Sequence, residues 1–373
     1  MRTSRALLGP ALLSVLALAT PAHAESPATV GGTLLSTRGV VVGEGAPSLP
    51  VTAAAGWLVA DLDTGQVLGA RDPHGRYAPA STLKTLTALT LIPKLDAHEQ
   101  VRPSFEDVNV EGSRVGLVDS VDYPISQLFT AMLVVSGNDA ANTLASANGG
   151  LAKTLEDMNA EADRLQAHDT HAATANGLDA PNQLSSAYDL ALIARAGMQL
   201  PAFRDYVSTK RSRIRGPGGR TIAISSHDKL LYNYDGAIGI KNGYTVKARA
   251  TFVGAATRGG HTLVVTLMRT NPRYWPEAAA LLDWGFAAEA AGTTPIGELV
   301  LPVASAEGAS GPVPTAVPVA QPAKAHRPTS AKSAIATTPL LSAGLLSVGA
   351  LLLTKRVRRV RRRQRGRLRL PPI

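Results

Sequence analysis

The sequence predicts an α+β fold in which a mostly antiparallel sheet is covered by helices. Strand-like runs occur near the start and again late in the central part of the chain, and segments with helical periodicity lie between them. The late strands are short and are separated by Gly and polar turns, which favours antiparallel connections. With 373 residues, 45% of them hydrophobic, the chain is long enough to bury a proper core in one large domain or two ordinary ones.

The first predicted elements are a hairpin and a helix. The segment GWLVADLDTGQVLGARD alternates around an Asp-Thr-Gly turn, which predicts strands at 57–61 and 67–70. A helix is expected to start between Pro79 and Ser81. Apolar residues then recur at helical spacing, at Leu83, Leu86, Leu89 and Ile92.

The middle of the chain is predicted to be helical and the later part to be strand-rich. Residues 125–147 form two helical segments that are broken at Ser136-Gly137-Asn138, and another helix begins after Ser185 or Ser186 as its cap. The pattern then predicts strands at 220–225, 237–240, 250–256 and 261–268, and a closing helix at 276–286.

The N-terminus has the pattern of an export signal. Two arginines precede an apolar run at 6–18, and Ala22-His23-Ala24 is a small-residue cleavage site, which together predict a signal peptide at 1–24. Residues 25–50 are small and contain Gly and Ser, so we expect a loose leader before a folded domain at 51–295.

Beyond the domain, the sequence predicts a linker and a membrane anchor. Residues 296–333 are rich in Pro and Ala and suit a semi-extended spacer. The uncharged residues 334–353 would reach about 30 Å as a helix, the thickness of the hydrocarbon core of a bilayer. Because the basic tail 354–373 should stay in the cytoplasm, we expect an exported protein held at the outer face of the cytoplasmic membrane by this single helix.

Composition disfavours two classes of site. The net charge of +10 is matched by Lys355 and nine arginines in the tail, so the basic excess is no binding face and nucleic acid is not an expected partner. The chain has no cysteine, which excludes disulfides, thiolate metal sites and a cysteine nucleophile.

Ser81 and Lys84 form the first of three short motifs that suggest nucleophilic catalysis. At i and i+3 on a helix their side chains lie one turn apart on the same face, within reach of each other. A serine becomes a good nucleophile only when a base takes its proton, and lysine can be that base only if its pKa is lowered by burial or by a nearby cation. On its own this pair is also what ordinary helix capping produces, but Ser136-Gly137-Asn138 and Lys241-Asn242-Gly243 accompany it.

In this order, the three motifs resemble the S-x-x-K, S-x-N and K-T-G signature of the penicillin-recognising serine enzymes. The surrounding segments APASTLK, VVSGNDAA, NGLDAPNQLSSAYDLALIARA, GIKNGYT and LLDWGF are similar to those of the low-molecular-mass penicillin-binding proteins of the peptidase S11 family, which act as serine D-alanyl-D-alanine carboxypeptidases. The resemblance covers about residues 53–286. It implies a β-lactamase/transpeptidase-like fold, with a helical subdomain beside the sheet.

The resemblance also implies a role for each motif. Ser81 would be the acylated nucleophile and Lys84 its base, and Ser136 would relay a proton between the lysines and the leaving amine. Asn138 would hold the peptide amide of the substrate. Lys241 would attract the terminal carboxylate of the substrate and help to keep Lys84 neutral.

Five further residues are expected to contribute to substrate binding. The backbone N–H of Tyr244, with that of the nucleophile, would form an oxyanion hole beside Gly243. Thr245 and Arg273 would contact the substrate carboxylate. Asn242 departs from the family pattern, which most often has threonine there, although its amide can still offer a hydrogen bond.

These implications predict an enzyme that cleaves the terminal D-alanine from peptidoglycan stem pentapeptides and binds β-lactam antibiotics, with no metal or cofactor. One alternative is a serine β-lactamase, which is disfavoured because no E-x-x-L-N follows the second motif. Another is a catalytically silent cell-wall scaffold of the same fold. His168 and His171 do not suggest a metal site, because neither H-E-x-x-H nor a third nearby ligand accompanies them.

Overall fold

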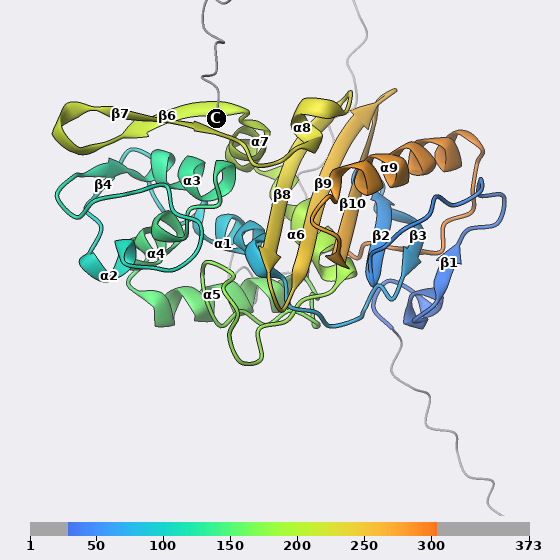
Figure 1. The fold of residues 1–373 in the computed structure, drawn as a ribbon. Helices are drawn as coiled ribbons and strands as arrows, with labels where there is room; N and C mark the ends of the chain where they lie inside the picture. Colours follow the sequence, from blue (N-terminus) through green and yellow to red (C-terminus); the bar gives the residue numbers. More distant parts are fainter. Residues whose placement is uncertain (1–28, 304–373) are drawn as a thin grey trace, which may run out of the picture. The chain divides into compact units, whose positions relative to one another are not determined.

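The computed structural model describes residues 29–303 (Figure 1). The predicted signal peptide, membrane helix and basic tail, and nearly all of the predicted linker, lie outside these residues. Within residues 29–303, none of the helices has the length and apolar character needed to cross a membrane.

A seven-stranded antiparallel sheet forms the centre of the fold. Its order is β1-β3-β2-β10-β9-β8, and β11 also pairs with β3. The strands are β1 (Val40–Val42), β2 (Gly56–Asp61), β3 (Gln66–Arg71), β8 (Ala237–Thr245), β9 (Arg249–Arg258), β10 (His261–Thr270) and β11 (Gly297–Glu298). The predicted α+β class with an antiparallel sheet is therefore confirmed, and β8 ends the sheet as an edge strand (Figure 1).

The predicted hairpin is β2 and β3, and its turn is fixed by a short polar side chain. Asp61 Oδ1 accepts hydrogen bonds from the backbone N–H groups of Asp63 and Thr64, both at 2.7 Å. Gly65 follows with φ of +87°, a conformation that favours glycine.

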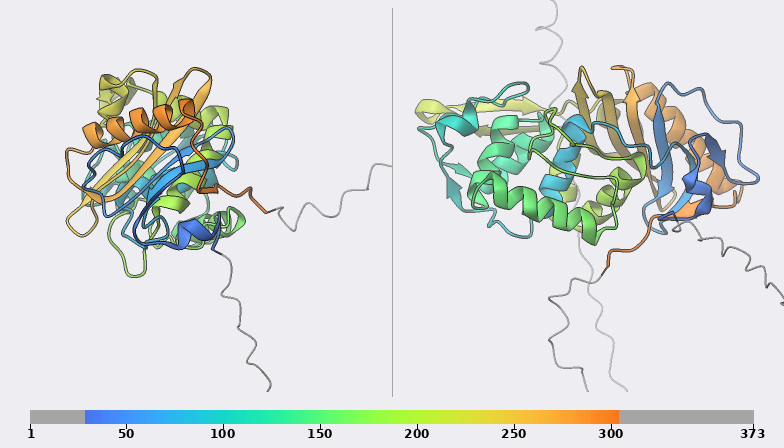
Figure 2. Two further views of the ribbon diagram at one scale, coloured as in Figure 1. Left: turned by 90° about the vertical axis from the view of Figure 1, so that its right-hand side faces the viewer. Right: turned by 90° about the horizontal axis from the view of Figure 1, so that it is seen from below.

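Helices cover both faces of the sheet (Figures 1 and 2). On one face, α9 (Trp275–Ala290) packs on β2, β3, β9 and β10. On the other face lie the short 3-10 turn η2 (Ala80–Leu83), α1 (Lys84–Leu91) and α6 (Ala187–Gln199). Helix α6 begins as predicted, because the Ser186 side chain accepts a hydrogen bond from the N–H of Asp189 at 3.1 Å.

A helical part of the chain lies beside the sheet, shown in cyan and green in Figure 2. It contains α2 (Phe105–Val108), α3 (Ile125–Val134), α4 (Asn138–Ala147), α5 (Leu151–Arg164) and α7 (Pro201–Ser208). Two small antiparallel pairs complete it, β4 (Gln100–Val101) with β5 (Tyr123–Pro124) and β6 (Arg211–Arg215) with β7 (Thr221–Ser225). The predicted break between two helices at 136–138 separates α3 from α4. The turns η3 (Pro217–Gly219) and α8 (Leu230–Asn233) connect strands.

Residues 29–50 are not a loose leader, as the sequence suggested, but part of the fold. The turn η1 (Thr33–Ser36) buries Leu35 completely, and β1 pairs with β3. The carbonyl of Pro47 accepts a 3.0 Å hydrogen bond from the indole N–H of Trp284. The other end of the predicted domain also extends further, because β11 at 297–298 pairs with β3 inside the expected linker.

Candidate active site

The segment that carries Ser81 is held between the sheet and a neighbouring turn. The hydroxyl of Thr251 on β9 donates to the carbonyl of Pro79 at 2.7 Å. A Cβ atom on Gly177 would lie 2.1 Å from the carbonyl oxygen of Ala80, so this turn packs directly against the helix start. Ser81 itself is half-buried, with its side chain at the beginning of the helix where the sequence placed it.

Lys84, one turn further, is completely buried and its amine contacts three oxygen atoms. Its Nζ lies 3.0 Å from Ser81 Oγ and donates to Asn138 Oδ1 at 2.7 Å. It also donates to the backbone carbonyl of Asn176. The Asn138 amide cannot be turned over, because its Nδ2 donates to the Glu111 carbonyl at 2.7 Å and a carbonyl only accepts.

The pKa of Lys84 is lowered well below its usual value, first by burial and then by the nearby charge of Lys241, while Asp139 acts in the opposite direction. A neutral amine has two N–H groups and one lone pair. The oxygens of Asn138 and Asn176 can only accept, so they take both N–H groups. The lone pair then faces the Ser81 hydroxyl, which is the geometry of a general base beside its nucleophile.

The second motif forms the connection between α3 and α4. Ser136 is 5% exposed and has φ of 61°, a left-handed conformation that is uncommon for a serine. This backbone is held on both sides, because Gly137 N–H donates to the Ala131 carbonyl at 3.1 Å and Asn138 N–H donates to the Ser113 carbonyl at 2.8 Å. The connection therefore presents Ser136 and Asn138 from one rigid bend.

Asn138 positions Lys84, a role that its family resemblance did not give it. Asn138 is 2% exposed. Its Oδ1 accepts from Lys84, and its Nδ2 donates to the Glu111 carbonyl. The Asn138 amide therefore orients Lys84 through Oδ1, while the second N–H of its Nδ2 stays a predicted contact for the peptide amide of a substrate.

The third motif lies on the edge strand β8. Lys241 is 1% exposed, and its Nζ donates to the carbonyl of Asn242 at 2.7 Å. Burial lowers the pKa of Lys241 to about 7, although the nearby Asp228 opposes this shift. Successive side chains of a strand point to opposite faces, so Asn242 points away from the face of Lys241.

Gly243 brings β8 into contact with the helix that carries the nucleophile. A Cβ atom at this position would lie 2.7 Å from the backbone nitrogen of Ser81 and 3.0 Å from that of Thr82. No other residue type fits without moving these elements apart. The close approach places the backbone of β8 beside the N–H of Ser81, as an oxyanion hole formed by Ser81 and Tyr244 requires.

The remaining predicted residues differ in their placement. Tyr244 is 58% exposed. The Thr245 hydroxyl donates to Asp179 Oδ1 at 3.0 Å and accepts from the N–H of Ala248 at 3.0 Å. Arg273 is exposed and lines a hollow together with Pro276 and residues 51–53, and no residue of the three motifs lines that hollow.

Sequence reasoning missed several groups that position the lysines. The turn at 173–178, which supplies the Asn176 carbonyl, is held by the buried side chain of Gln183. Gln183 Oε1 accepts from Ala173 N–H, Thr174 N–H and the Thr174 hydroxyl at 3.1, 2.8 and 2.9 Å, and its Nε2 donates to the Leu178 carbonyl at 2.6 Å. Buried Asp228 is the second missed group. The segment NGLDAPNQ, residues 176–183, was part of the family resemblance, but the resemblance gave neither the Asn176 carbonyl nor Gln183 a role.

The segment around His168 and His171 has a structural role in the part of the chain described. Asp169 Oδ2 lies 2.7 Å from His74 Nδ1, and the Thr170 hydroxyl donates to buried Asp189 at 2.7 Å. Neither His168 nor His171 belongs to a cluster of metal-ligating side chains within residues 29–303.

Comparisons with known proteins support the family resemblance. Residues 44–271 match the model of the D-alanyl-D-alanine carboxypeptidase family, peptidase S11. The chain is 44% identical over 250 residues to the D-alanyl-D-alanine carboxypeptidase DacB2 of Mycobacterium tuberculosis, covering 65% of this chain and 86% of that protein. It is 31% identical over 255 residues to DacD of Escherichia coli, covering 64% of each chain.

Solved structures give the same result. A D-alanyl-D-alanine carboxypeptidase of Mycobacterium tuberculosis matches with a TM-score of 0.64 and 44% identity, over 66% of this chain and 96% of that chain. A Streptomyces DD-transpeptidase matches with a TM-score of 0.62 and 28% identity, over 65% of this chain and all of that one (100%). The expected fold family is thereby confirmed.

Proposed function

Because the chain belongs to the D-alanyl-D-alanine carboxypeptidase family, peptidase S11, we propose that it removes the terminal D-alanine from peptidoglycan stem pentapeptides through an acyl-enzyme on Ser81. The observation that carries this proposal is the amine of Lys84, 3.0 Å from Ser81 Oγ, with both N–H groups of its neutral form taken by other oxygens.

Acylation follows from this arrangement. Lys84 takes the proton of the Ser81 hydroxyl, and Oγ forms a bond to the carbonyl carbon of the penultimate D-alanine. The negative oxygen is stabilised by the N–H groups of Ser81 and Tyr244. When the C–N bond breaks, the proton that Lys84 took moves through the Ser136 hydroxyl to the nitrogen, and D-alanine leaves. Water then cleaves the Ser81 ester, which gives the shortened peptide and restores the hydroxyl.

Substrate binding uses the exposed edge of the sheet. Strand β8 pairs only with β9 among the described residues, so its other edge has backbone N–H and C=O groups free to pair with an extended peptide. A positive charge on Lys241 attracts the terminal carboxylate of that peptide. A β-lactam carries a carboxylate and a reactive amide, so it binds as a substrate mimic and acylates the same serine.

The contacts of Ser81 and Lys84 favour the carboxypeptidase over the β-lactamase. Within residues 29–303, no Asp or Glu side chain forms a hydrogen bond or ion pair with Ser81 or Lys84. A carboxylate that holds the hydrolytic water against a penicilloyl ester is therefore not part of this cluster.

The test is to incubate the protein with a fluorescent penicillin, map the labelled residue by mass spectrometry and measure release of D-alanine from a D-Ala-D-Ala peptide. We expect a lasting label on Ser81 and release of D-alanine, and both should be lost in Ser81→Ala. Rapid turnover without a lasting label would instead identify a β-lactamase. Absence of both label and release would indicate a scaffold.

We further propose that the protein is exported and anchored at the outer face of the cytoplasmic membrane. The support is in the sequence, namely the export signal at 1–24, the uncharged run at 334–353 and the basic tail after it. Protease treatment of intact cells should degrade the catalytic domain and spare a tag placed after residue 373. Protection of the domain would contradict this orientation.

A further inference from the structure

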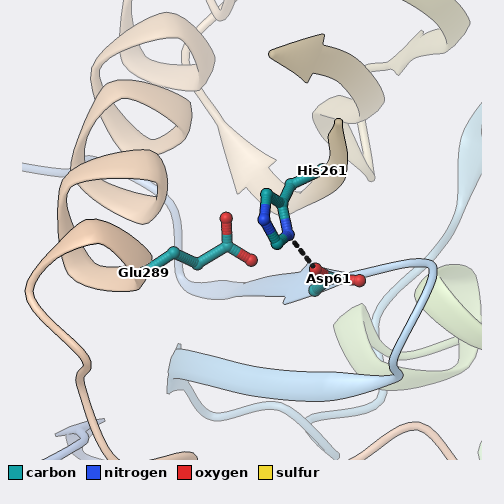
Figure 3. Close-up of side chains that lie close together, drawn as sticks. All are labelled: Asp61, His261 and Glu289. Carbon is teal, nitrogen blue, oxygen red and sulfur yellow. Dashed lines mark hydrogen bonds and ion pairs between the residues drawn. The ribbon is translucent and has the colours of Figure 1, made fainter. Parts of the chain in front are cut away.

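A second group of polar side chains lies three strands across the sheet from Lys241 (Figure 3). Asp61 ends β2, His261 begins β10 and Glu289 lies in the last turn of α9. One ligand atom from each, a carboxylate oxygen or an imidazole nitrogen, lies within 4.8 Å of the other two. Figure 3 shows the three side chains pointing toward one another.

Asp61 has one carboxylate oxygen that its structural role does not use. Oδ1 holds the β2–β3 turn through the N–H groups of Asp63 and Thr64. Oδ2 faces the cluster, and the side chain is only 3% exposed. The donor nearest to Oδ2 among the hydrogen bonds of the described residues is His261 Nδ1 at 3.4 Å, beyond the usual 2.7–3.2 Å of an N–H···O bond. This buried oxygen therefore has no N–H donor within the usual range, and Glu289 is its other neighbour in the cluster.

Glu289 adds a second carboxylate to the same point. In the part of the chain described, neither Asp61 nor Glu289 forms an ion pair with a lysine or arginine, and the contact between Asp61 and His261 is the one ion pair of the cluster. Two carboxylates that face each other repel unless a proton or a metal cation lies between them, and burial together with the contact to Asp61 raises the pKa of Glu289 to about 7. The three side chains thus offer ligand atoms for a cation, which would compete with a proton shared by Asp61 and Glu289.

We propose that Asp61 Oδ2, His261 Nδ1 and a carboxylate oxygen of Glu289 bind a divalent transition-metal ion, with Zn²⁺ as the best fit. Zinc bonds of about 2.0–2.1 Å in a tetrahedron put neighbouring ligand atoms about 3.4 Å apart. The separation of Asp61 Oδ2 and His261 Nδ1 is 3.4 Å, too long for a good hydrogen bond but suited to two ligands of one zinc ion. Water would complete the coordination.

The ligand set distinguishes this ion from calcium and magnesium. Those ions prefer six or more oxygen ligands, whereas one imidazole with two carboxylates suits zinc and its neighbours. The ion would join the β2–β3 turn, the β9–β10 turn and the end of α9. At about 4.8 Å per strand, this point is roughly 14 Å across the sheet from β8, so the site would stabilise the fold and take no part in catalysis.

The experiment uses the full chain, treated with a chelator and then titrated with Zn²⁺ by calorimetry. We expect one ion per chain and a higher midpoint of thermal unfolding with the metal present. The variants His261→Gln and Glu289→Gln should each weaken Zn²⁺ binding by at least about 100-fold, because even residues that only hydrogen-bond to a metal ligand contribute about 10- to 100-fold. His98→Gln is the matched control, an exposed histidine outside the cluster, and should bind as the unmodified chain does.

Three outcomes would overturn the proposal: no saturable binding of Zn²⁺, equal loss in His98→Gln, or unchanged binding in His261→Gln. A fourth would be a midpoint of thermal unfolding that rises on acidification but not on addition of Zn²⁺. That result would mean that Asp61 and Glu289 share a proton instead of binding a metal ion. Asp61→Asn is avoided because it also alters the β2–β3 turn. Acylation of Ser81 by penicillin should be unchanged in His261→Gln, so the metal site and the proposed function can fail independently.

Discussion

At the scale of single residues, two buried lysines define the chemistry of the site. An ammonium group that leaves water without a carboxylate partner is strongly disfavoured, so burial shifts the equilibrium of Lys84 and Lys241 toward the neutral amine. The two groups differ in their neighbours. The charge of Lys241 lowers the pKa of Lys84 further, whereas the charge of Asp228 acts to raise the pKa of Lys241. One amine thus suits a base and the other a cationic binding group.

The pKa of about 7 for Lys241 leads to a specific pH dependence of kcat/KM. Above this pH, Lys241 loses its charge and its attraction for the substrate carboxylate, so kcat/KM should fall on the alkaline side. On the acidic side, kcat/KM should fall as Lys84 becomes protonated and can no longer act as a base. The measurement is the pH profile of kcat/KM, which reports the groups of the free enzyme.

A peptide with a terminal amide in place of the carboxylate provides the control. Its cleavage should be slower at neutral pH and should lack the alkaline fall, since it has no charge for Lys241 to attract. If both peptides show the same alkaline limb, the fall has another cause and the binding role of Lys241 is wrong.

Gln183 is expected to affect catalysis without touching the substrate. Its side chain holds both ends of the 173–178 turn, and this turn delivers the Asn176 carbonyl to Lys84. In Gln183→Leu the turn should relax and let the Lys84 lone pair turn away from Ser81. Acylation by penicillin should slow by about 100-fold, the effect of misplacing a reacting group by about 1 Å.

The matched control for Gln183→Leu is Asn159→Leu. Asn159 also uses its amide to hold a backbone segment, with hydrogen bonds to both Ala172 N–H and the Ala172 carbonyl, but it lies outside the turn. Both variants should lose stability in urea unfolding, and only Gln183→Leu should lose acylation rate. Equal slowing in the two would mean that general destabilisation explains the effect.

At the scale of elements, the contact between β8 and η2 sets the width of the site. The register of β8 on β9 places Gly243 opposite Thr251, and Thr251 in turn holds Pro79 before the nucleophile. Strand and helix start are therefore linked both directly and through β9. A change of a few tenths of an ångström at Gly243 alters the space in which the carbonyl of the substrate has to fit.

Gly243→Ala tests this contact. The new methyl group would meet the backbone nitrogens of Ser81 and Thr82 at 2.7 and 3.0 Å, so β8 has to move away. We expect a loss of about 1–3 kcal/mol in the free energy of unfolding, as for other overpacked sites, and acylation slowed by about 100-fold. Gly39→Ala is the control, since its methyl group would meet no atom closer than 3.5 Å. Normal acylation in Gly243→Ala would show that the oxyanion hole does not depend on this approach.

Some elements could be predicted from the sequence and others could not, for physical reasons. The β2–β3 hairpin and the break before α4 have turn residues between apolar segments, and both were predicted. Helix α5 was missed because most of its surface is polar and it buries only Thr154, Met158 and Ala162. The left-handed conformation of Ser136 has no sequence signature, since hydrogen bonds to Ala131 and Ser113 around it create it.

At the scale of the whole molecule, the site joins segments that are distant in sequence. Ser81 comes from η2 and Lys84 from the first residue of α1, whereas Asn138 comes from the helical part and Lys241 from the edge of the sheet. Their spacing along the chain does not predict that they meet, and only the family resemblance suggested it. Backbone groups such as the Asn176 carbonyl remained hidden, because every residue has a carbonyl and only the fold selects one.

The N-terminal segment shows how much of the fold can depend on residues that look featureless. Leu35 is fully buried against the domain, while its neighbour Leu34 is 55% exposed. Leu35→Ala should lower the free energy of unfolding by about 2–5 kcal/mol, the usual cost of a cavity left by a buried leucine. Leu34→Ala should change it by no more than about 0.5 kcal/mol, as expected for an exposed position. Urea unfolding of the two variants measures both values.

The rate at which penicillin acylates Ser81 shows whether Leu35→Ala and Leu34→Ala change stability alone or catalysis as well. Both leucines lie near β1 and β11 at the far edge of the sheet from β8, so the labelling rate with penicillin should equal that of the unmodified chain while the protein is folded. If Leu35→Ala were as stable as Leu34→Ala, residues 29–50 would be a detachable leader after all. A catalytic domain that began at residue 51 would then fold as well as one that began at 29, whereas the pairing of β1 with β3 requires it to be less stable.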